Sequence, residues 1–268
     1  TAGTIFLMWI GELISEKNIG NGISLLIFAG IVSSLPTVVQ NAIVNYDPSQ
    51  LYLYVMFVGL AIVTIVGVVI INEGQRNIPV SYAKQIRGNK TFGGNSSHLP
   101  LRVNMAGVIP IIFAISVVLF PSMLAQLFVN GSGFMASASR ATIALFNNQW
   151  FYGIVYFLLV FGFTYFYTAV IFHPQKMAEN LQRQGAFIPG IRPGKETEKY
   201  LQSTMSKLLF SGAFFLGAIA VLPLIVQAFT GSQSLVIGGT SLLIVVSVAI
   251  EMAKQIESQI KMHEYDRV

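Results

Sequence analysis

The sequence is dominated by long stretches that contain no charged side chain. Five of them cover residues 18–46, 48–72, 103–139, 141–175 and 208–250. A helix of about 20 apolar residues crosses the ~30 Å hydrocarbon core of a bilayer. The last stretch would measure roughly 64 Å as a single helix at ~1.5 Å per residue. It is therefore expected to fold back at Thr230–Gln233.

These stretches predict six membrane-spanning helices, and the predicted fold class is an all-α, polytopic membrane helix bundle. Residues 1–10 are predicted to be the end of a seventh helix. They carry no initiator Met, charged leader region or cleavage site, so we expect the chain to start inside a longer protein. A membrane β-barrel would need shorter, alternating segments. The predicted spans are 22–44, 51–72, 104–128, 149–173, 208–229 and 233–250.

Composition excludes the main soluble alternatives. Apolar residues make up 54% of the chain and charged residues only 10%, whereas a soluble domain carries about 25% charged residues. A soluble enzyme or a nucleic-acid-binding domain is therefore excluded. Cysteine is absent and the three histidines are dispersed, so no metal site and no cofactor are expected. No nucleophile, base and orienting group are brought together by a motif, and we predict no enzyme activity.

The distribution of cations predicts the orientation. The predicted connections 11–20, 73–103 and 174–207 and the tail 251–268 fall on one side, and 45–50, 129–148 and 230–232 fall on the other. The first side carries 15 of the 16 Lys and Arg residues, and the second carries only Arg140. The positive-inside rule makes the first side, and with it the C-terminus, cytoplasmic. The net charge of +5 thus follows from topology rather than from nucleic-acid binding.

Two of the basic connections are unusually long for links between helices. The 73–103 loop contains the run NIPVSYAKQIRGNKTF, whose alternation and Gly88-Asn89 pair predict a hairpin. The centre of the 174–207 loop is FIPGIRPG, which favours a rigid turn with Arg192 at its tip. The charges satisfy the positive-inside rule by themselves, and attraction to anionic lipid is a second interpretation. The loop length and turn chemistry favour a surface that binds RNA phosphates or an acidic protein.

Four motifs resemble one known family. IGNGISLLIF (19–28), HLPLRVNMAGVIPIIF (98–113), GAFIPGIRPG (185–194) and GGTSLLIVV (238–246) closely resemble the SecY family, the channel subunits of the bacterial protein translocase. The resemblance covers essentially the whole chain and corresponds to the end of the fourth through the tenth transmembrane helix. It implies one half of a pseudo-symmetric channel in the bacterial plasma membrane. Such a channel passes unfolded secretory polypeptides and releases hydrophobic segments sideways into lipid.

The resemblance also implies site residues and partners. The partners are SecE and SecG, the SecA motor ATPase or the ribosome on the basic loops, the translocating polypeptide, the lipid bilayer and the missing N-terminal half of SecY. The implied pore ring of aliphatic side chains is Ile23, Ile27, Ile112 and Ile244. The implied lateral gate includes Asn104, Pro110, Ser116 and Phe120, with Pro110 expected to remove a helix hydrogen bond and bend its helix. The implied docking residues for the motor or ribosome are Arg76, Lys84, Arg87, Lys90, Arg192 and Lys195.

Spacing gives an independent check on the ring. Ile27, Ile112 and Ile244 each lie ten residues from a cation at the cytoplasmic end of their segment. Ten helical residues rise roughly 15 Å, half the hydrocarbon core. Three isoleucines on three spans are thus expected at a similar, central depth.

Two other functions remain open from the residues alone. A secondary transporter with inverted repeats would tolerate the Gly and Pro residues within the spans. However, the interiors of the six predicted spans hold no Asp, Glu, Lys or Arg, and ion-coupled transport sites usually need such groups. A structural membrane subunit without a pore of its own is the other possibility.

Overall fold

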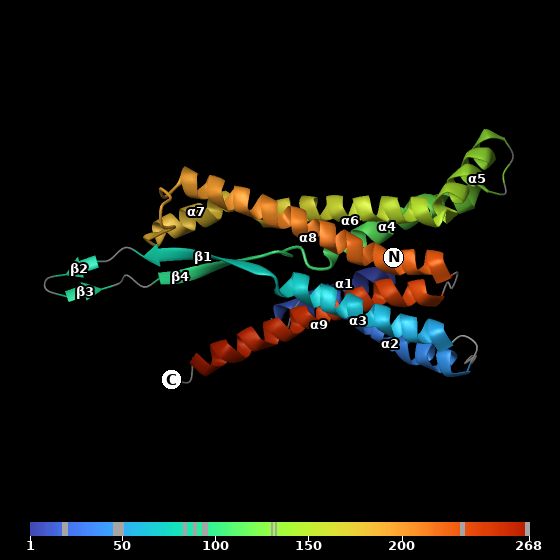
Figure 1. Cartoon of the computed structure of the whole chain (residues 1–268), viewed down its shortest axis with the longest axis horizontal. Coiled ribbons are helices and arrows are strands. Elements are labelled where there is room, and N and C mark those ends of the chain that lie inside the picture. Colours follow the sequence, from blue (N-terminus) through green and yellow to red (C-terminus); the bar gives the residue numbers. More distant parts are fainter. Residues whose placement is uncertain are drawn as a thin grey trace. The chain divides into compact units, whose positions relative to one another are not determined.

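The computed structural model describes residues 1–17, 21–44, 51–82, 85–87, 90–92, 96–129, 131, 133–230 and 234–265. Most of these residues are helical, which confirms the predicted all-α class (Figure 1). The helices are α1 (Ala2–Glu16), α2 (Gly22–Val44), α3 (Leu51–Glu73), α4 (Ile109–Phe128), α5 (Phe134–Asn147), α6 (Gln149–Ile171), α7 (Pro174–Arg183), α8 (Lys195–Thr230) and α9 (Ser234–Tyr265). The strands are β1 (Gln75–Tyr82), β2 (Gln85–Arg87), β3 (Lys90–Phe92), β4 (Ser96–Arg102) and β5 (Ala186–Phe187).

The chain divides into two compact units. The first contains Thr1–Ile70, Ile143–Gly153 and Ile219–Val268, and the second contains Ile71–Thr142 and Ile154–Ala218. Among the described residues, three helical segments are long and apolar enough to cross a membrane: Ile109–Phe128, Gln149–Arg183 and Lys195–Ala228. Gly22–Ser34 and Val58–Glu73 are shorter apolar segments.

In the first unit, glycines allow α1 and α2 to approach closely. A Cβ atom on Gly22 would overlap the backbone carbonyl of Gly11. Asn21 immediately precedes α2, and its side-chain oxygen accepts a hydrogen bond from the backbone N–H of Ile23 at 3.1 Å, as an N-cap residue does. Asn21 and Gly22 of the first motif therefore cap α2 and let it approach α1 closely. The same unit packs α2 against α9.

In the second unit, a junction holds the end of α3, the sheet and the start of α4 together. The Val103 N–H donates to the Gly74 carbonyl at 2.8 Å. The Asn104 side-chain amide donates to the Asn72 side-chain oxygen, also at 2.8 Å. A Cβ atom on Gly212 of α8 would lie 2.7 Å from Val103 Cγ1 and 2.9 Å from the Val103 carbonyl oxygen. The glycine thus lets α8 pass directly against this junction.

Several helix ends differ from the predicted ranges, because a charged residue marks a membrane boundary without ending a helix. α1 continues past residue 10 to Glu16. α8 begins at Lys195, inside the predicted 174–207 loop, and α9 continues to Tyr265 through much of the predicted 251–268 tail. Glu and Lys are good helix formers, so these ends extend in helical form beyond the apolar stretch.

Two predicted connections contain helices of their own. α7 lies in the 174–207 loop and starts at Pro174, and α5 lies in the 129–148 connection. The predicted 104–128 helix begins only at Ile109, after Gly107 with φ 62°. The expected bend at Pro110 is wrong, because Pro110 lies in the first turn of α4, where its missing N–H has no helical partner to lose. Pro121 is the proline inside this helix.

Candidate docking surface and pore helices

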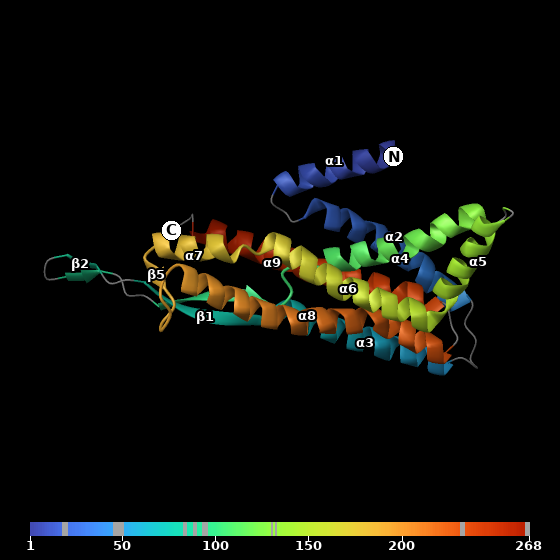
Figure 2. The same cartoon turned by 90° about the horizontal axis from the view of Figure 1, so that it is seen from above.

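The two long basic loops fold into one element. β1 and β4 of the first loop pair antiparallel, and β5 of the second loop joins β1, which gives the strand order β4-β1-β5. Ser81 of β1 is opposite Phe187, and Tyr82 is opposite Ala186. Within the second unit, β1 lies at the same end as α7 and the start of α8 in both views (Figures 1 and 2). We call β1, β4, β5, α7, the 188–194 turn and the first turns of α8 the basic loop module.

The hairpin predicted within the first loop is confirmed. β2 pairs antiparallel with β3, and Arg87 is opposite Lys90 across residues 88–89. The predicted turn at the Gly-Asn pair itself lies outside the described residues. The β2–β3 ribbon lies beyond the outer end of β1 (Figure 1).

A shared hydrophobic core joins the two loops. Ile78 and Val80 on β1 are 1% and 3% exposed, and they alternate with exposed residues along the strand. A strand with one covered face shows this period of two. The covering residues come from both loops. The core consists of Ile78, Val80, Leu101, Ala186, Ile188 and Leu201, with Met177 and Leu181 of α7 packed against it.

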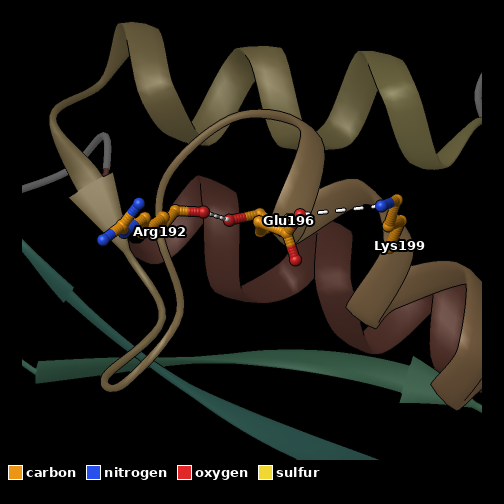
Figure 3. A network of polar contacts seen from close by, with 4 residues as sticks. Arg192, Glu196 and Lys199 are labelled. Carbon is orange, nitrogen blue, oxygen red and sulfur yellow. Dashed lines mark hydrogen bonds and ion pairs between the residues drawn. The ribbon is translucent and has the colours of Figure 1, made fainter.

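Arg192 stands on a turn that the backbone constrains tightly. Gly190 and Gly194 on either side have φ of 84° and 99°, a region that L side chains rarely adopt. The Thr197 hydroxyl, in a residue only 2% exposed, donates to the Arg192 carbonyl at 2.9 Å. The Arg192 side chain is exposed and points away from the Glu196–Lys199 ion pair, whose N–O distance is 3.6 Å (Figure 3). Within the described part of the chain, no carboxylate pairs with the Arg192 guanidinium.

The other predicted docking residues lie on the module and on the first loop beyond it. Arg76 is exposed near the α3 end of β1, roughly 16 Å along the strand from the Ser81–Phe187 pair at ~3.3 Å per residue. Lys195 is exposed at the first position of α8. The backbones of Arg87 and Lys90 lie in β2 and β3. Their side chains, and the whole of Lys84, lie outside the described residues.

Three residues of the module had not been singled out from the sequence. Thr197 supports the arginine turn. Tyr82 and Phe187 are exposed aromatic side chains, 36% and 37% exposed, on the two paired strands β1 and β5. A strand of two residues has no periodicity, so the sequence held no signal for β5 or for the exposure of Phe187.

The predicted pore isoleucines fall in both units. Ile23 and Ile27 lie on α2 and Ile244 on α9, in the first unit, and Ile112 lies on α4 in the second. Ile23 is 49% exposed, whereas Ile244 is 7% exposed and so is buried. The Ile23 N–H also donates to the Asn21 side-chain oxygen in the first turn of α2.

α4 separates its buried residues from the predicted functional ones. Its buried positions include Ile111, Ala114, Val118 and Ala125. At ~100° per residue these four share one face, and Ile112, Ser116 and Phe120 lie on the other side of the helix. Ser116 and Phe120 are exposed and Ile112 is half-buried. At the helix entry, the Oδ1 atom of Asn104 is buried without a hydrogen-bond partner among the described residues.

Comparison with known proteins identifies the family. The SecY family model matches residues 1–253. A relative from Halalkalibacterium halodurans, named protein translocase subunit SecY, is 46% identical and aligns with 99% of this chain and 63% of its own length. The relatives of the same name from Vibrio cholerae and Thermotoga maritima are 43% and 42% identical, over 61% and 59% of their lengths. The chain therefore spans about three fifths of the length of these curated relatives.

Solved structures support the fold. A structure described as that of a protein conducting channel matches with a TM-score of 0.62 and 20% identity, over 96% of this chain and 63% of that one. A second structure concerns the plug domain of the SecY protein. It matches with a TM-score of 0.62 and 21% identity, over 96% of this chain and 64% of that one. Because the SecY family model matches nearly all of its residues, this chain belongs to the SecY family.

Proposed function

We propose that this chain is the larger part of the channel subunit of a bacterial protein translocase. The observation that carries the proposal is the match of the SecY family model to residues 1–253, together with relatives named protein translocase subunit SecY. The role is that of a passage, so it needs no catalytic group and no cofactor, and the energy comes from a partner. A secondary transporter is not favoured, because none of these relatives carries such a name.

The proposed passage is lined by Ile23, Ile27, Ile112 and Ile244. A pore for chains of every sequence gains nothing from specific polar contacts. An aliphatic constriction resists ion leakage by dewetting and closes around a moving chain without binding it tightly. Ile23 and Ile112 are at least partly accessible. Ile244 is buried, so its assignment requires that α9 expose it when a polypeptide enters.

The exposed side of α4 is proposed to form one wall of a lateral gate. Ser116 and Phe120 lie on this exposed side, whereas Pro110 is buried in the first turn of α4 and Asn104 precedes the helix. Pro110 starts the helix rather than bending it, so movement of the wall would arise at the Val103–Val108 segment. The unpartnered Oδ1 atom of Asn104 in that segment favours a place that rearranges, since buried polar atoms usually have a partner.

The basic loop module is proposed to dock the partner that drives transport, SecA or the ribosome, on the cytoplasmic side of the plasma membrane. Arg192 is its central contact. A guanidinium is a planar donor that suits a carboxylate or a phosphate, and the turn presents it without an internal carboxylate partner among the described residues. Arg76, Lys84, Arg87, Lys90 and Lys195 extend the positive surface. SecE and SecG are the proposed membrane partners.

Crosslinking of a stalled secretory chain tests the pore assignment. A photo-crosslinking residue is placed at Ile27, Ile112 or Ile244 of the complete channel, and at Val117 as a matched control. Val117 lies on the same helix as Ile112 and is 42% exposed, but it is rotated by about 140° from Ile112. Adducts at the isoleucines and few at Val117 are expected. Equal or greater yield at Val117 would contradict the assignment of α4.

Arg192→Glu tests the docking role. We expect loss of partner-dependent translocation with normal assembly of the channel, because the charge reversal repels an anionic partner. Lys199→Glu is the control, since Lys199 is exposed but paired with Glu196. Normal transport by Arg192→Glu, or equal loss in both variants, would overturn the role of the turn.

A further inference from the structure

α5 has three distinct faces. At ~100° per residue, Phe134, Ala138, Ala141 and Leu145 lie along one line. All four are exposed, Phe134 at 86% and Leu145 at 54%. A second face carries the buried residues Ala136 and Ser139, and a third carries the polar side chains Ser137, Arg140 and Asn147. The helix thus packs with one face and leaves an apolar face and a polar face uncovered.

The connections of α5 place it at one end of two apolar helices. α4 ends at Phe128 and α6 begins at Gln149, so only short links separate α5 from both. The Asn148 side-chain oxygen accepts a hydrogen bond from the Trp150 N–H at 3.1 Å and caps α6. The Phe146 ring meets the Phe151 ring edge to face, with centroids 5.5 Å apart. These contacts fix the C-terminal end of α5 against the start of α6.

The charge of this region is limited to one residue. Between Arg102 and Lys176, the only charged side chain is Arg140, which is exposed. The segment therefore offers Arg140 no carboxylate of its own. Trp150 at the start of α6 is 62% exposed, and tryptophan at a helix end is typical of the boundary between lipid and water.

We propose that α5 lies in the interfacial layer of the bilayer, with its Phe134–Leu145 face against the acyl chains and Arg140 bound to the phosphate of an anionic lipid. The basic loop module precedes the start of α4 and follows the end of α6, so α5 belongs to the opposite leaflet. Phe128 and Trp150 at the adjoining helix ends are also exposed. An amphipathic helix with this division of faces is buried about 5–10 Å into the headgroup boundary.

Fluorescence quenching by brominated lipids tests the placement. The 268-residue sequence contains no cysteine. Any cysteine elsewhere in the complete channel is replaced by serine, and a single environment-sensitive fluorophore is attached at Phe134→Cys, Leu145→Cys, Ser137→Cys or Asn147→Cys. Vesicles contain phosphatidylglycerol and phosphatidylcholine with or without bromine near the headgroup end of the acyl chains. Quenching at positions 134 and 145 should exceed that at 137 and 147 by about twofold or more.

A second arm tests the role of Arg140. With the fluorophore at Leu145→Cys and bromine on only one lipid, phosphatidylglycerol should quench more than phosphatidylcholine. Arg140→Gln should remove this preference, and Arg140→Lys should keep most of it. Absent quenching at 134 and 145 would mean that protein covers the apolar face, and equal quenching at all four sites would mean that the helix has no fixed orientation. Either result overturns the proposal, and a preference unchanged in Arg140→Gln overturns the phosphate contact.

Discussion

Removing one hydroxyl is expected to loosen the turn that presents Arg192. Thr197→Val keeps the shape of the side chain but leaves the Arg192 carbonyl without its donor at 2.9 Å. A buried acceptor that loses its only partner costs about 1–3 kcal/mol. Because this hydrogen bond is only partly buried, we expect a cost in the lower part of that range, about 1–2 kcal/mol. Such a cost raises the population of the open turn by a factor of roughly 5–30.

Hydrogen exchange measures this population directly. The Ile191 N–H donates to the Ile188 carbonyl at 3.0 Å, and the Glu198 N–H donates to the Gly194 carbonyl at 3.1 Å. Both amides should exchange roughly 5–30-fold faster in Thr197→Val, since exchange follows local opening. Thr197→Ser keeps the donor and should stay close to the parent chain.

A second control separates the turn from the helix. Thr204→Val removes another buried hydroxyl, two turns along α8, and should leave the exchange of Ile191 unchanged. The reasoning is refuted if Thr197→Val exchanges like the parent, or if Thr197→Ser is accelerated as much as Thr197→Val. In the first case the two glycines alone would hold the turn.

Three further substitutions test the packing. Gly212→Ala places a Cβ atom against the backbone that leads into α4. It should lower the free energy of unfolding by about 1–3 kcal/mol, which is measured as a lower thermal midpoint. Gly162→Ala is the control, because its Cβ atom meets no atom within 4 Å and should leave the midpoint unchanged. Leu201→Ala empties a fully buried site in the core of the basic loop module and should cost about 2–5 kcal/mol, measured as faster proteolysis of both loops. Gly22→Ala should separate α1 from α2 and reduce assembly of the channel, whereas Gly30→Ala, in open space, should not.

Local pattern was enough to predict much of the fold. Apolar stretches predict α2 and α3 almost to the residue, because each is bounded by turn-forming residues. Alternation and the Gly-Asn pair predict the β2–β3 hairpin, since turn length sets the register of paired strands. Helix ends outside the apolar stretches were missed where the helix continues in polar form, as α8 does from Lys195.

Contacts between distant segments could not be predicted from local sequence patterns. β5 has two residues and gains its pairing only from β1, more than 100 positions earlier in the chain. α7 did leave a usable signal, because Pro174 suits the first helical turn and Met177 and Leu181 are one turn apart. In the site, turn chemistry pointed to Arg192, whereas a single Thr197 among charged residues matches no pattern.

The shared core couples the structures of the two basic loops. Leu101 of the first loop and Ile188 of the second are 0% and 3% exposed in the same cluster. A substitution at Leu101 therefore reaches the turn of Arg192 through packed side chains, although the two lie in separate loops. Because a close-packed core does not absorb a lost side chain without adjustment, we expect docking defects to arise from either loop. A docking defect therefore identifies the substituted residue as a contact with the partner only when the core of the module is shown to be intact.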